Sequence, residues 1–366
     1  MAQDVTPTLE RLLDQFLPVE PGSIEAEFDR IWQDASSGSY DTSSVRLRVS
    51  NFIAWGGDAE GEAGERFEHV IGLLAQRHPC RAILAVTAAD AGSLQSAISA
   101  HCWRTAVGGR HICSEEILLR GRPSGEREMA SALLALLVPE LPVHLWLIGD
   151  PDAKRRVPEE LLDLADRLYV DSAAGAASGV ALRAIAAALS DRGPAIIDLA
   201  WERTTAWREL AAQFFDGPRT SAELQRLTEI EIDGGAGGVS AAALLLAGWL
   251  AASLELSLAS VEASNSLVRA TFYDGTRGVQ LQVAPSAAGM EIERVKLATG
   301  GAEFYIELHP ASGHMHVRSD FAEEPVHRTV APEPDDDASV LTAAVEDTSA
   351  PETYARALRA ALELLG

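Results

Sequence analysis

The most constraining feature of the sequence is an apolar segment that is framed by prolines and closed by a turn. Residues 136–151 read LLVPELPVHLWLIGDP, and the apolar run ends at Gly149, Asp150 and Pro151. A short apolar run bounded by turn residues is typical of a strand buried in an α/β sheet. Such sheets place their chemistry in the loops after the strands, and Asp150 is the reactive side chain that follows this one. The segment therefore predicts an α/β fold and indicates that the protein binds rather than catalyses.

The hydrophobic pattern divides the rest of the chain into four parts. Residues 1–43 predict two amphipathic helices and a linker, and residues 44–203 alternate strand and helix patterns. Residues 204–328 begin with a helix that we expect to bridge the two large parts, and alternating strands follow it. Residues 329–366 combine an acidic, Pro-rich linker, which we expect to be disordered, with a terminal helix that docks on its own protein or on a partner.

The predicted fold class is α/β. Repeated β-α-β patterns indicate parallel strands in the first large part, and the pair Gly108 and Gly109 indicates an antiparallel hairpin. We therefore expect a mixed, three-layer sheet there. The second large part should be a smaller α+β unit that contains an antiparallel meander.

Composition excludes several classes of partner. The chain has 366 residues and a formal net charge of −24, which repels both a phosphate backbone and an anionic membrane. The N-terminus lacks the pattern of a secretory signal, and the longest apolar stretch, residues 241–254, is shorter than the roughly 20 residues that span a bilayer. We expect a cytoplasmic protein that binds neither nucleic acid nor membrane.

A glycine-rich segment has the context in which a nucleotide phosphate could bind. Residues Gly234 to Gly238 read GGAGG and lie between a predicted strand and a predicted helix, where a loop can hold a phosphate. The third position of a Gly-x-Gly-x-x-Gly pattern falls on Ser240, and no P-loop lysine follows. A surface loop is the favoured interpretation, and a nucleotide-binding enzyme is the alternative.

Cysteine and histidine side chains raise the question of a metal site or a thiol switch. The candidates lie in residues 78–113 and comprise His78, Cys80, His101, Cys102, His111 and Cys113. If Gly108 and Gly109 form the hairpin turn, Arg104 pairs with Cys113, and no compact set of four ligands results. We expect no metal and no disulfide framework, with the cysteines acting as small buried apolar residues. A redox regulator working through Cys102 and Cys113 is the alternative.

Two further groups of residues could contact a partner. Arg77, His78 and Arg81 lie at a helix-to-strand junction, where they complement the helix end or bind another protein. Trp201 and Trp207 flank the bridge helix and are either buried or available for docking. His78 as a general base would need a nucleophile, and the sequence offers none nearby. We therefore predict no catalytic residue and no cofactor-binding residue.

The chain resembles the glucose-6-phosphate dehydrogenase assembly proteins, the OpcA family. The resemblance covers about residues 45–310 and rests on five segments in the family's order. These segments are RHPCRAILAV from Arg77, CSEEILLRG from Cys113, the apolar run at 136–151, AWRELAAQFFDGP from Ala206 and LLLAGWLAASL from Leu244. The resemblance implies a non-catalytic protein that binds glucose-6-phosphate dehydrogenase and promotes its active oligomer, in support of NADPH supply through the oxidative pentose phosphate pathway.

Overall fold

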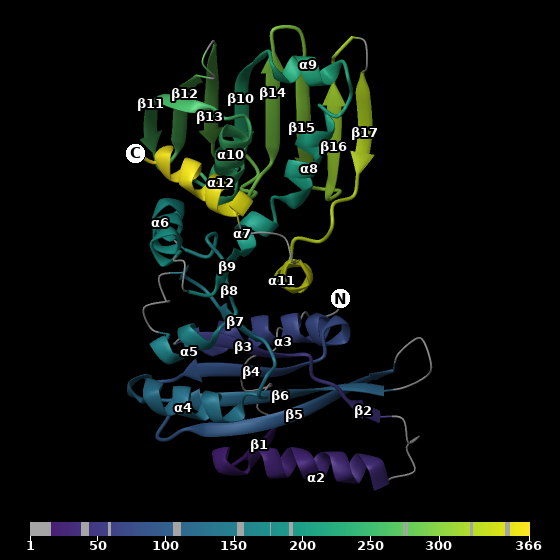
Figure 1. Ribbon diagram of the computed structural model, residues 1–366, viewed down its shortest axis with the longest axis vertical. Coiled ribbons are helices and arrows are strands. Elements are labelled where there is room, and N and C mark those ends of the chain that lie inside the picture. Colours follow the sequence, from purple (N-terminus) through teal and green to yellow (C-terminus); the bar gives the residue numbers. More distant parts are fainter. Residues whose placement is uncertain are drawn as a thin grey trace. The chain divides into compact units, whose positions relative to one another are not determined.

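The computed structural model describes residues 16–37, 44–57, 60–104, 111–151, 157–175, 177–189, 193–273, 275, 277–322, 325–347 and 352–366. The chain forms two compact units. Unit 1 comprises Met1–Asp171, Ser190–Ile197 and Asp336–Asp347, and unit 2 comprises Ser172–Leu189, Asp198–Asp335 and Thr348–Gly366. Both units are mixtures of helices and strands, as Figure 1 shows, and the predicted α/β class is confirmed.

Unit 1 is built on a mixed sheet with the strand order β1-β5-β6-β4-β3-β7-β8-β9, and β2 pairs with β6. Its strands are β1 (Leu17–Val19), β2 (Ser44–Arg46), β3 (Ser50–Gly57), β4 (Cys80–Thr87), β5 (Gln95–Arg104), β6 (His111–Gly121), β7 (Val143–Leu147), β8 (Arg167–Val170) and β9 (Ala195–Asp198). The path β6-β4-β3-β7-β8-β9 has the order 3-2-1-4-5-6 of a doubly wound sheet. The initial apolar segment supplies β7, in which every residue is buried.

Helices cover both faces of this sheet and make the three layers that the sequence predicted. Glu115 and Glu116 are neighbours on β6, so their side chains point to opposite faces. Glu115 accepts a hydrogen bond from Trp32 of α2 (Ile24–Ser37), whereas Glu116 is influenced by the charge of Glu68 on α3 (Glu60–Arg77). Helices α4 (Glu126–Leu136) and α5 (Glu159–Leu164) complete the connections between strands.

The hairpin of β5 and β6 differs in register from its prediction. Arg104 pairs with His111, and position 102 lies directly opposite Cys113. The predicted pairing of Arg104 with Cys113 is therefore wrong by two residues, since the observed register is not the one that a two-residue turn at Gly108 and Gly109 would set. Those glycines lie outside the described residues.

Unit 2 is built on an eight-stranded sheet with the order β11-β12-β13-β10-β14-β15-β16-β17. Its strands are β10 (Leu227–Asp233), β11 (Ser257–Ser264), β12 (Leu267–Tyr273), β13 (Gly278–Ala284), β14 (Arg294–Thr299), β15 (Glu303–His309), β16 (His314–Ser319) and β17 (Val326–Val330). Neighbouring strands are antiparallel except for the parallel pair β10 and β13. The meander predicted from the alternating pattern is present from β14 to β17.

One face of the eight-stranded sheet carries the buried apolar side chains. Helices cover this face (Figure 1). Helices α8 (Thr205–Gln213), α9 (Thr220–Leu224) and α10 (Ala241–Ser253) lie on this side, and α12 (Glu352–Glu363) packs on α10. Phe304 on β15 meets the rings of Phe214 and Phe215, which follow α8, at 5.1 and 4.9 Å. Helix α6 (Ser178–Ala188) and the short α7 (Leu199–Glu202) also belong to unit 2.

The acidic segment is ordered from residue 329 to residue 347, which corrects the prediction of a disordered linker over this part; residues 348–351 lie outside the described residues. It completes β17 and then forms α11 (Asp337–Glu346), which packs on α3 in unit 1. Asp336 caps α11 by accepting hydrogen bonds from the backbone amides of Ala338 and Ser339. Leu341 is fully buried. The acidic residues around the start of α11 gave this segment the composition of a linker, so the short amphipathic helix was not predicted.

The ends of the chain meet their predictions in part. The second predicted N-terminal helix is present as α2, whereas most of the first lies outside the described residues and Leu17 belongs to strand β1. The terminal helix α12 docks on its own unit. The division between the two units does not fall at residue 203, because Ser172–Leu189, which holds α6, belongs to unit 2 and the chain then returns to unit 1 at Ser190–Ile197. In the described residues, no helix is long and apolar enough to cross a membrane.

Candidate functional site

Arg77 and His78 lie at the C-terminal end of α3 and face α11. Their side-chain nitrogens are 3.7 and 3.1 Å from Glu346 Oε1. The side chain of Arg77 is 58% exposed and that of His78 is 25% exposed. Both residues therefore help to hold α11, and Arg77 keeps enough exposed surface to contact another protein.

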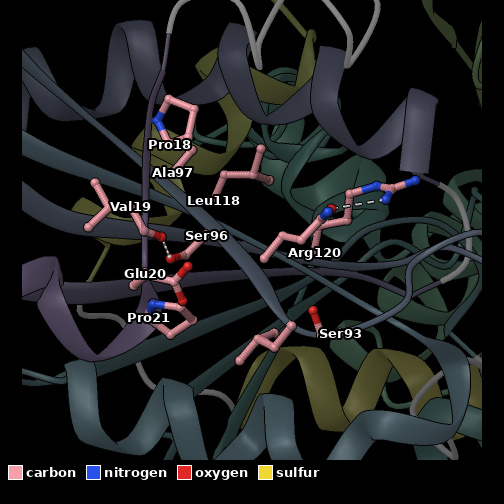
Figure 2. A pocket seen from close by; sticks show the side chains of 11 residues that line it. Pro18, Val19, Glu20, Pro21, Ser93, Ser96, Ala97, Leu118 and Arg120 are labelled. Carbon is pink, nitrogen blue, oxygen red and sulfur yellow. Dashed lines mark hydrogen bonds between the residues drawn. The ribbon is translucent and has the colours of Figure 1, made fainter.

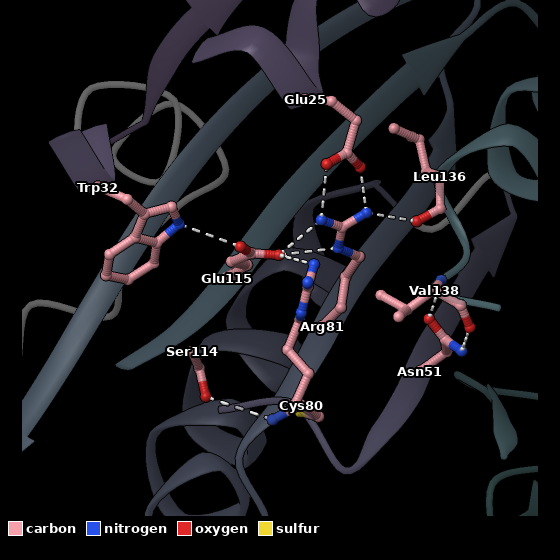
Figure 3. Close-up of polar contacts among 10 residues, drawn as sticks. Glu25, Trp32, Asn51, Cys80, Arg81, Ser114, Glu115, Leu136 and Val138 are labelled. Carbon is pink, nitrogen blue, oxygen red and sulfur yellow. Dashed lines mark hydrogen bonds and ion pairs between the residues drawn. The ribbon is translucent and has the colours of Figure 1, made fainter. Parts of the chain in front are cut away.

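Arg81 is buried in a polar cluster, as Figure 3 shows. Its guanidinium donates to Glu115 Oε2 from Nε and Nη2 at 2.8 and 2.7 Å, and Nη1 donates to the Leu136 carbonyl at 2.7 Å. Glu25 of α2 forms a second ion pair with Arg81. Burial lowers the pKa of Arg81, but the two carboxylates outweigh burial and leave that pKa raised. Arg81 fastens α2 to the sheet and exposes only 2% of its side chain.

Trp201 and Trp207 are also buried, each about 6% exposed. Trp201 on α7 lies under the Arg208 guanidinium, whose central carbon is 3.8 Å from the ring centre, and beside the Tyr354 ring at 5.8 Å. These contacts favour burial within unit 2, one of the two roles left open for the tryptophans. Of the five predicted contact residues, Arg77 presents the most surface.

The glycine-rich segment lines a cavity of about 580 Å³ in unit 2. A Cβ at Gly234 would lie 2.3 Å from the Glu291 carbonyl oxygen, and Gly235 has a φ of +105°. Ser240 caps α10 by accepting from the Ala243 amide, and its hydroxyl donates to the Glu291 carbonyl at 2.5 Å. Arg183 lines the same cavity and donates to the carbonyls of Gly179 and Leu365. Close backbone packing therefore accounts for these glycines without a phosphate.

The turn after β3 is the other place where a doubly wound sheet binds a dinucleotide. Here the sequence reads GGDAEG from Gly56, which is not the Gly-x-Gly-x-x-Gly pattern and adds acidic residues near the start of α3. A Cβ at Gly56 would lie 2.4 Å from the Cβ of Ala63. Gly56 thus serves the packing of α3 on the sheet, and the carboxylates oppose a bound pyrophosphate.

A further cavity of about 610 Å³ lies in unit 1 along β1, β5 and β6 (Figure 2). Ser96 donates its hydroxyl hydrogen to the Val19 carbonyl, and Arg120 donates to Gln95 at 3.1 Å and to Asp90 at 2.5 Å. Ser96, Gln95 and Arg120, which line this cavity, are therefore engaged with the backbone or with other side chains. This arrangement stabilises the sheet edge and gives no specific anchor for a ligand.

The cysteines of the described residues differ from their prediction. Cys113 is disulfide-bonded, so the expectation that it acts as a small apolar residue is wrong. Cys80 is a free and buried thiol. Burial and the charge of Glu116 raise the pKa of Cys80 to about 12, so it is not a reactive thiolate at neutral pH. Within the described residues, no group of three or more His, Cys, Asp or Glu could hold a metal ion.

The largest feature that remains is the second face of the eight-stranded sheet, which we call the open face. It carries the side chains of residues that alternate with the buried apolar ones, and no described helix of unit 2 covers it. One row crosses all eight strands through directly paired positions. From β11 to β17 the row reads Glu262, Arg269, Gln282, Glu231, Lys296, Tyr305, Arg318 and His327.

Ion pairs organise the centre of the open face. The Lys296 ammonium lies 3.0 to 3.3 Å from the carboxylates of Glu229, Glu231 and Glu303, which together raise its pKa although partial burial opposes this. Arg294 pairs with Asp233 at 2.8 Å. Acidic residues therefore gather on β10, and basic residues lie beside them on β14. The sequence predicted the alternating strands but not this surface, because the signal lies in cross-strand register rather than in any local motif.

Comparison with protein families gives two matches that together cover most of the chain. Residues 73–187 match the model described as the glucose-6-phosphate dehydrogenase subunit N-terminal domain, and residues 194–358 match the corresponding C-terminal domain model. A protein of Synechocystis named OxPP cycle protein OpcA is 33% identical over 187 residues, which are 50% of this chain and 38% of that protein. Its namesake from Nostoc punctiforme is 30% identical over 225 residues, 61% of this chain and 48% of that protein. The matched stretch thus spans less than half of each relative.

A solved structure shares the fold at low identity. KijD10, a 3-ketoreductase from Actinomadura kijaniata in complex with NADP and TDP-benzene, is similar with a TM-score of 0.51 and 10% identity. The likeness covers 86% of this chain and 96% of that one. At this identity the likeness shows the fold alone, and the chemistry of this chain must be judged from its own residues.

Proposed function

Because the chain belongs to the glucose-6-phosphate dehydrogenase assembly protein family, OpcA, we propose that it is a non-catalytic factor that binds glucose-6-phosphate dehydrogenase and promotes its active oligomer. The observation that carries the proposal is the pair of family models, which cover parts of both units and are both described as domains of a dehydrogenase subunit. The protein would then serve the oxidative pentose phosphate pathway, the pathway in the names of its relatives. We place it in the cytoplasm.

The residues of the doubly wound sheet support a non-catalytic role. The turn after β3 carries acidic residues in place of the dinucleotide fingerprint. Gly56 is required by its close approach to the Ala63 side chain, and Gly234 by its close approach to the Glu291 carbonyl.

His144 is buried, and its Nδ1 lies 2.9 Å from the Tyr169 hydroxyl oxygen. Burial, aided by the charge of Arg167, lowers the pKa of His144 to about 4. A histidine with so low a pKa is a weak proton acceptor at pH 7, and this one is also enclosed, which does not suit a general base.

As an assembly factor, the protein would act through differential affinity. A ligand shifts an equilibrium between oligomers only if it binds one state more tightly than the other. The proposed factor therefore binds the assembled dehydrogenase better than the separate subunits. Its own residues would supply surface complementarity, and the covalent chemistry would remain with the dehydrogenase.

The test is an assay of the dehydrogenase from the same organism with and without the purified protein. We expect a higher specific activity and comigration of the two proteins on a sizing column. Unchanged kinetics together with separate elution would refute the proposal. Calorimetry with nicotinamide and adenine nucleotides tests the alternative, because micromolar binding by the isolated protein would favour a nucleotide-binding enzyme.

Arg77 provides a first test of where the dehydrogenase binds. Its exposed guanidinium lies in a segment of the family resemblance, so we expect Arg77→Glu to weaken the complex by about tenfold, as the loss and reversal of an interface charge does. Arg226→Glu is the matched control, because Arg226 is 68% exposed and lies in unit 2. Titration of the labelled dehydrogenase with each variant measures the effect. Equal affinities would remove Arg77 from the contact surface.

A further inference from the structure

We propose that the open face of the eight-stranded sheet is the surface on which two copies of this chain form a two-fold dimer. In this dimer the axis lies parallel to the strands and passes between β10 and β14. The proposal does not depend on the identity of any other partner. It rests on the strand order, the distribution of charge and the size of the face.

The strand order places opposite charges on either side of the middle of the sheet. Eight strands leave β10 and β14 as the central pair, with three strands beyond each of them. Strand β10 presents Glu229, Glu231 and Asp233 to the open face, and β14 presents Arg294 and Lys296. An acidic strand thus lies directly beside a basic one at the centre of the surface.

A two-fold axis along the strands makes this surface complementary to itself. Rotation about that axis lays β10 of one copy over β14 of the other and keeps positions of one row in register. Glu231 then faces Lys296 of the second copy, and Asp233 faces Arg294, twice each by symmetry. An axis across the strands would instead lay β10 over β10 and bring carboxylates together. Charge therefore selects the first arrangement.

The outer strands are compatible with the same arrangement. Strand β13 would lie over β15 of the second copy, which brings Gln282 to Tyr305. Strand β12 would lie over β16, which brings Arg269 to Arg318. Glu307 lies 3.8 Å from Arg318 within the same copy and offsets part of this like-charge repulsion, and Arg269 donates to Gln282 at 3.1 Å.

The open face also has the size of a specific interface. Eight strands spaced about 4.8 Å apart span about 34 Å, and six residues at about 3.3 Å each span about 20 Å. The product is roughly 700 Å² for each copy, close to the roughly 800 Å² that each partner contributes to a standard protein interface. Two sheets packed face to face with nearly aligned strands are an established arrangement.

Charge reversal at Glu231 and Lys296 gives the decisive experiment. Glu231→Lys places lysine opposite Lys296 of the second copy, and Lys296→Glu places glutamate opposite Glu231. Each variant alone should dimerise about 100-fold more weakly than the wild type, because two symmetry-related contacts become repulsive. An equimolar mixture of the two variants should recover the wild-type affinity to within about threefold, because every contact in the mixed dimer is again attractive. Sedimentation equilibrium measures the dimer dissociation constants of the two variants and of their mixture.

Mixing separates an effect on the interface from an effect on folding. The two residues also pair within one chain, and mixing cannot repair an intrachain pair. Glu333→Lys, an exposed charge reversal in the segment after β17, is the control and should leave the dimer unchanged. A monomeric wild-type protein at tens of micromolar, single variants that still dimerise, or folded variants whose mixture stays monomeric would each overturn the proposal.

A second measurement covers the case in which a single variant fails to fold. A photoactivated benzoylphenylalanine at Tyr305 of the otherwise unchanged full chain should crosslink to β13 of the second copy. Peptide mapping of a dimer mixed from isotopically light and heavy chains identifies such a link as intermolecular. Intermolecular links that reach other elements, or a complete absence of them at a concentration at which the chain is dimeric, would overturn the proposal.

Discussion

At the residue scale, the Glu116 carboxyl connects burial with the pH dependence of stability. Burial, and then the charge of Glu68, raise the pKa of Glu116 from 4.5 to about 7. A raised carboxyl pKa means that the folded state binds more protons than the unfolded state between pH 4.5 and 7. The burial of Glu116 therefore costs the folded state least below pH 4.5, where the carboxyl is protonated in both states. The free energy of unfolding falls as the pH rises from 4.5 to 7, and above pH 7 the full cost of burying the carboxylate is present.

Replacing Glu116 by glutamine should remove this penalty. We expect Glu116→Gln to become more stable relative to the wild type as the pH rises from 5 to 8, by up to about 3 kcal/mol at roughly 1.4 kcal/mol per pKa unit. Urea unfolding at a series of pH values measures the difference. Glu62→Gln, at a side chain that is 65% exposed, is the control. Parallel stability curves for Glu116→Gln and the wild type would contradict the assignment.

A second residue-scale prediction concerns the buried carboxylate of Asp198. Tyr354 on α12 donates its hydroxyl hydrogen to Asp198 Oδ2 at 3.1 Å, and both residues are buried. Tyr354→Phe removes this hydrogen bond, so we expect a loss of about 2 kcal/mol in the free energy of unfolding, the range for hydrogen bonds to charged groups. Tyr273→Phe, at a residue 51% exposed, should be nearly neutral in the same denaturation assay. Equal losses for the two variants would argue against a specific bond.

At the element scale, the close packing of α10 and α12 depends on one glycine. A Cβ at Gly248 would lie 2.2 Å from the Ala357 carbonyl oxygen and 2.7 Å from the Ala361 amide nitrogen. We expect Gly248→Ala to push α12 away, with a loss of roughly 1 to 3 kcal/mol and faster hydrogen exchange in residues 352–363. Gly72→Ala on α3 meets nothing within 4 Å and should be neutral or stabilising. Unchanged exchange in α12 of the first variant would contradict this packing.

Elements with a clear period were predictable from the sequence, and elements held by distant partners were not. The apolar run at 143–147 and the alternating strands of unit 2 were predictable from the sequence. A strand buried on both faces is apolar throughout, and a strand buried on one face alternates apolar and polar residues. Helix α11 was missed. Its stability comes from remote contacts, such as Arg66 to Asp337 and the Arg167 guanidinium to the carbonyls at its C-terminal end. Local composition cannot report such contacts.

At the scale of the whole molecule, the family was predictable, but the surfaces were not. Arg81 and Trp201 are residue types that dominate interfaces when exposed, and tertiary packing buries both of them here. The open face arises only when eight strands align in register, so no local sequence pattern predicts it. If the proposed dimer and the proposed dehydrogenase contact both hold, the factor is bivalent and can bring two dehydrogenase subunits together.

The most direct test of the central claim is the sedimentation velocity of the dehydrogenase at a concentration low enough for its oligomer to dissociate. We predict that stoichiometric addition of the purified protein shifts the labelled dehydrogenase to a larger species that contains both proteins. Specific activity measured in the same sample should rise in proportion to that species. A dehydrogenase whose sedimentation and activity are the same with and without the protein would contradict the account.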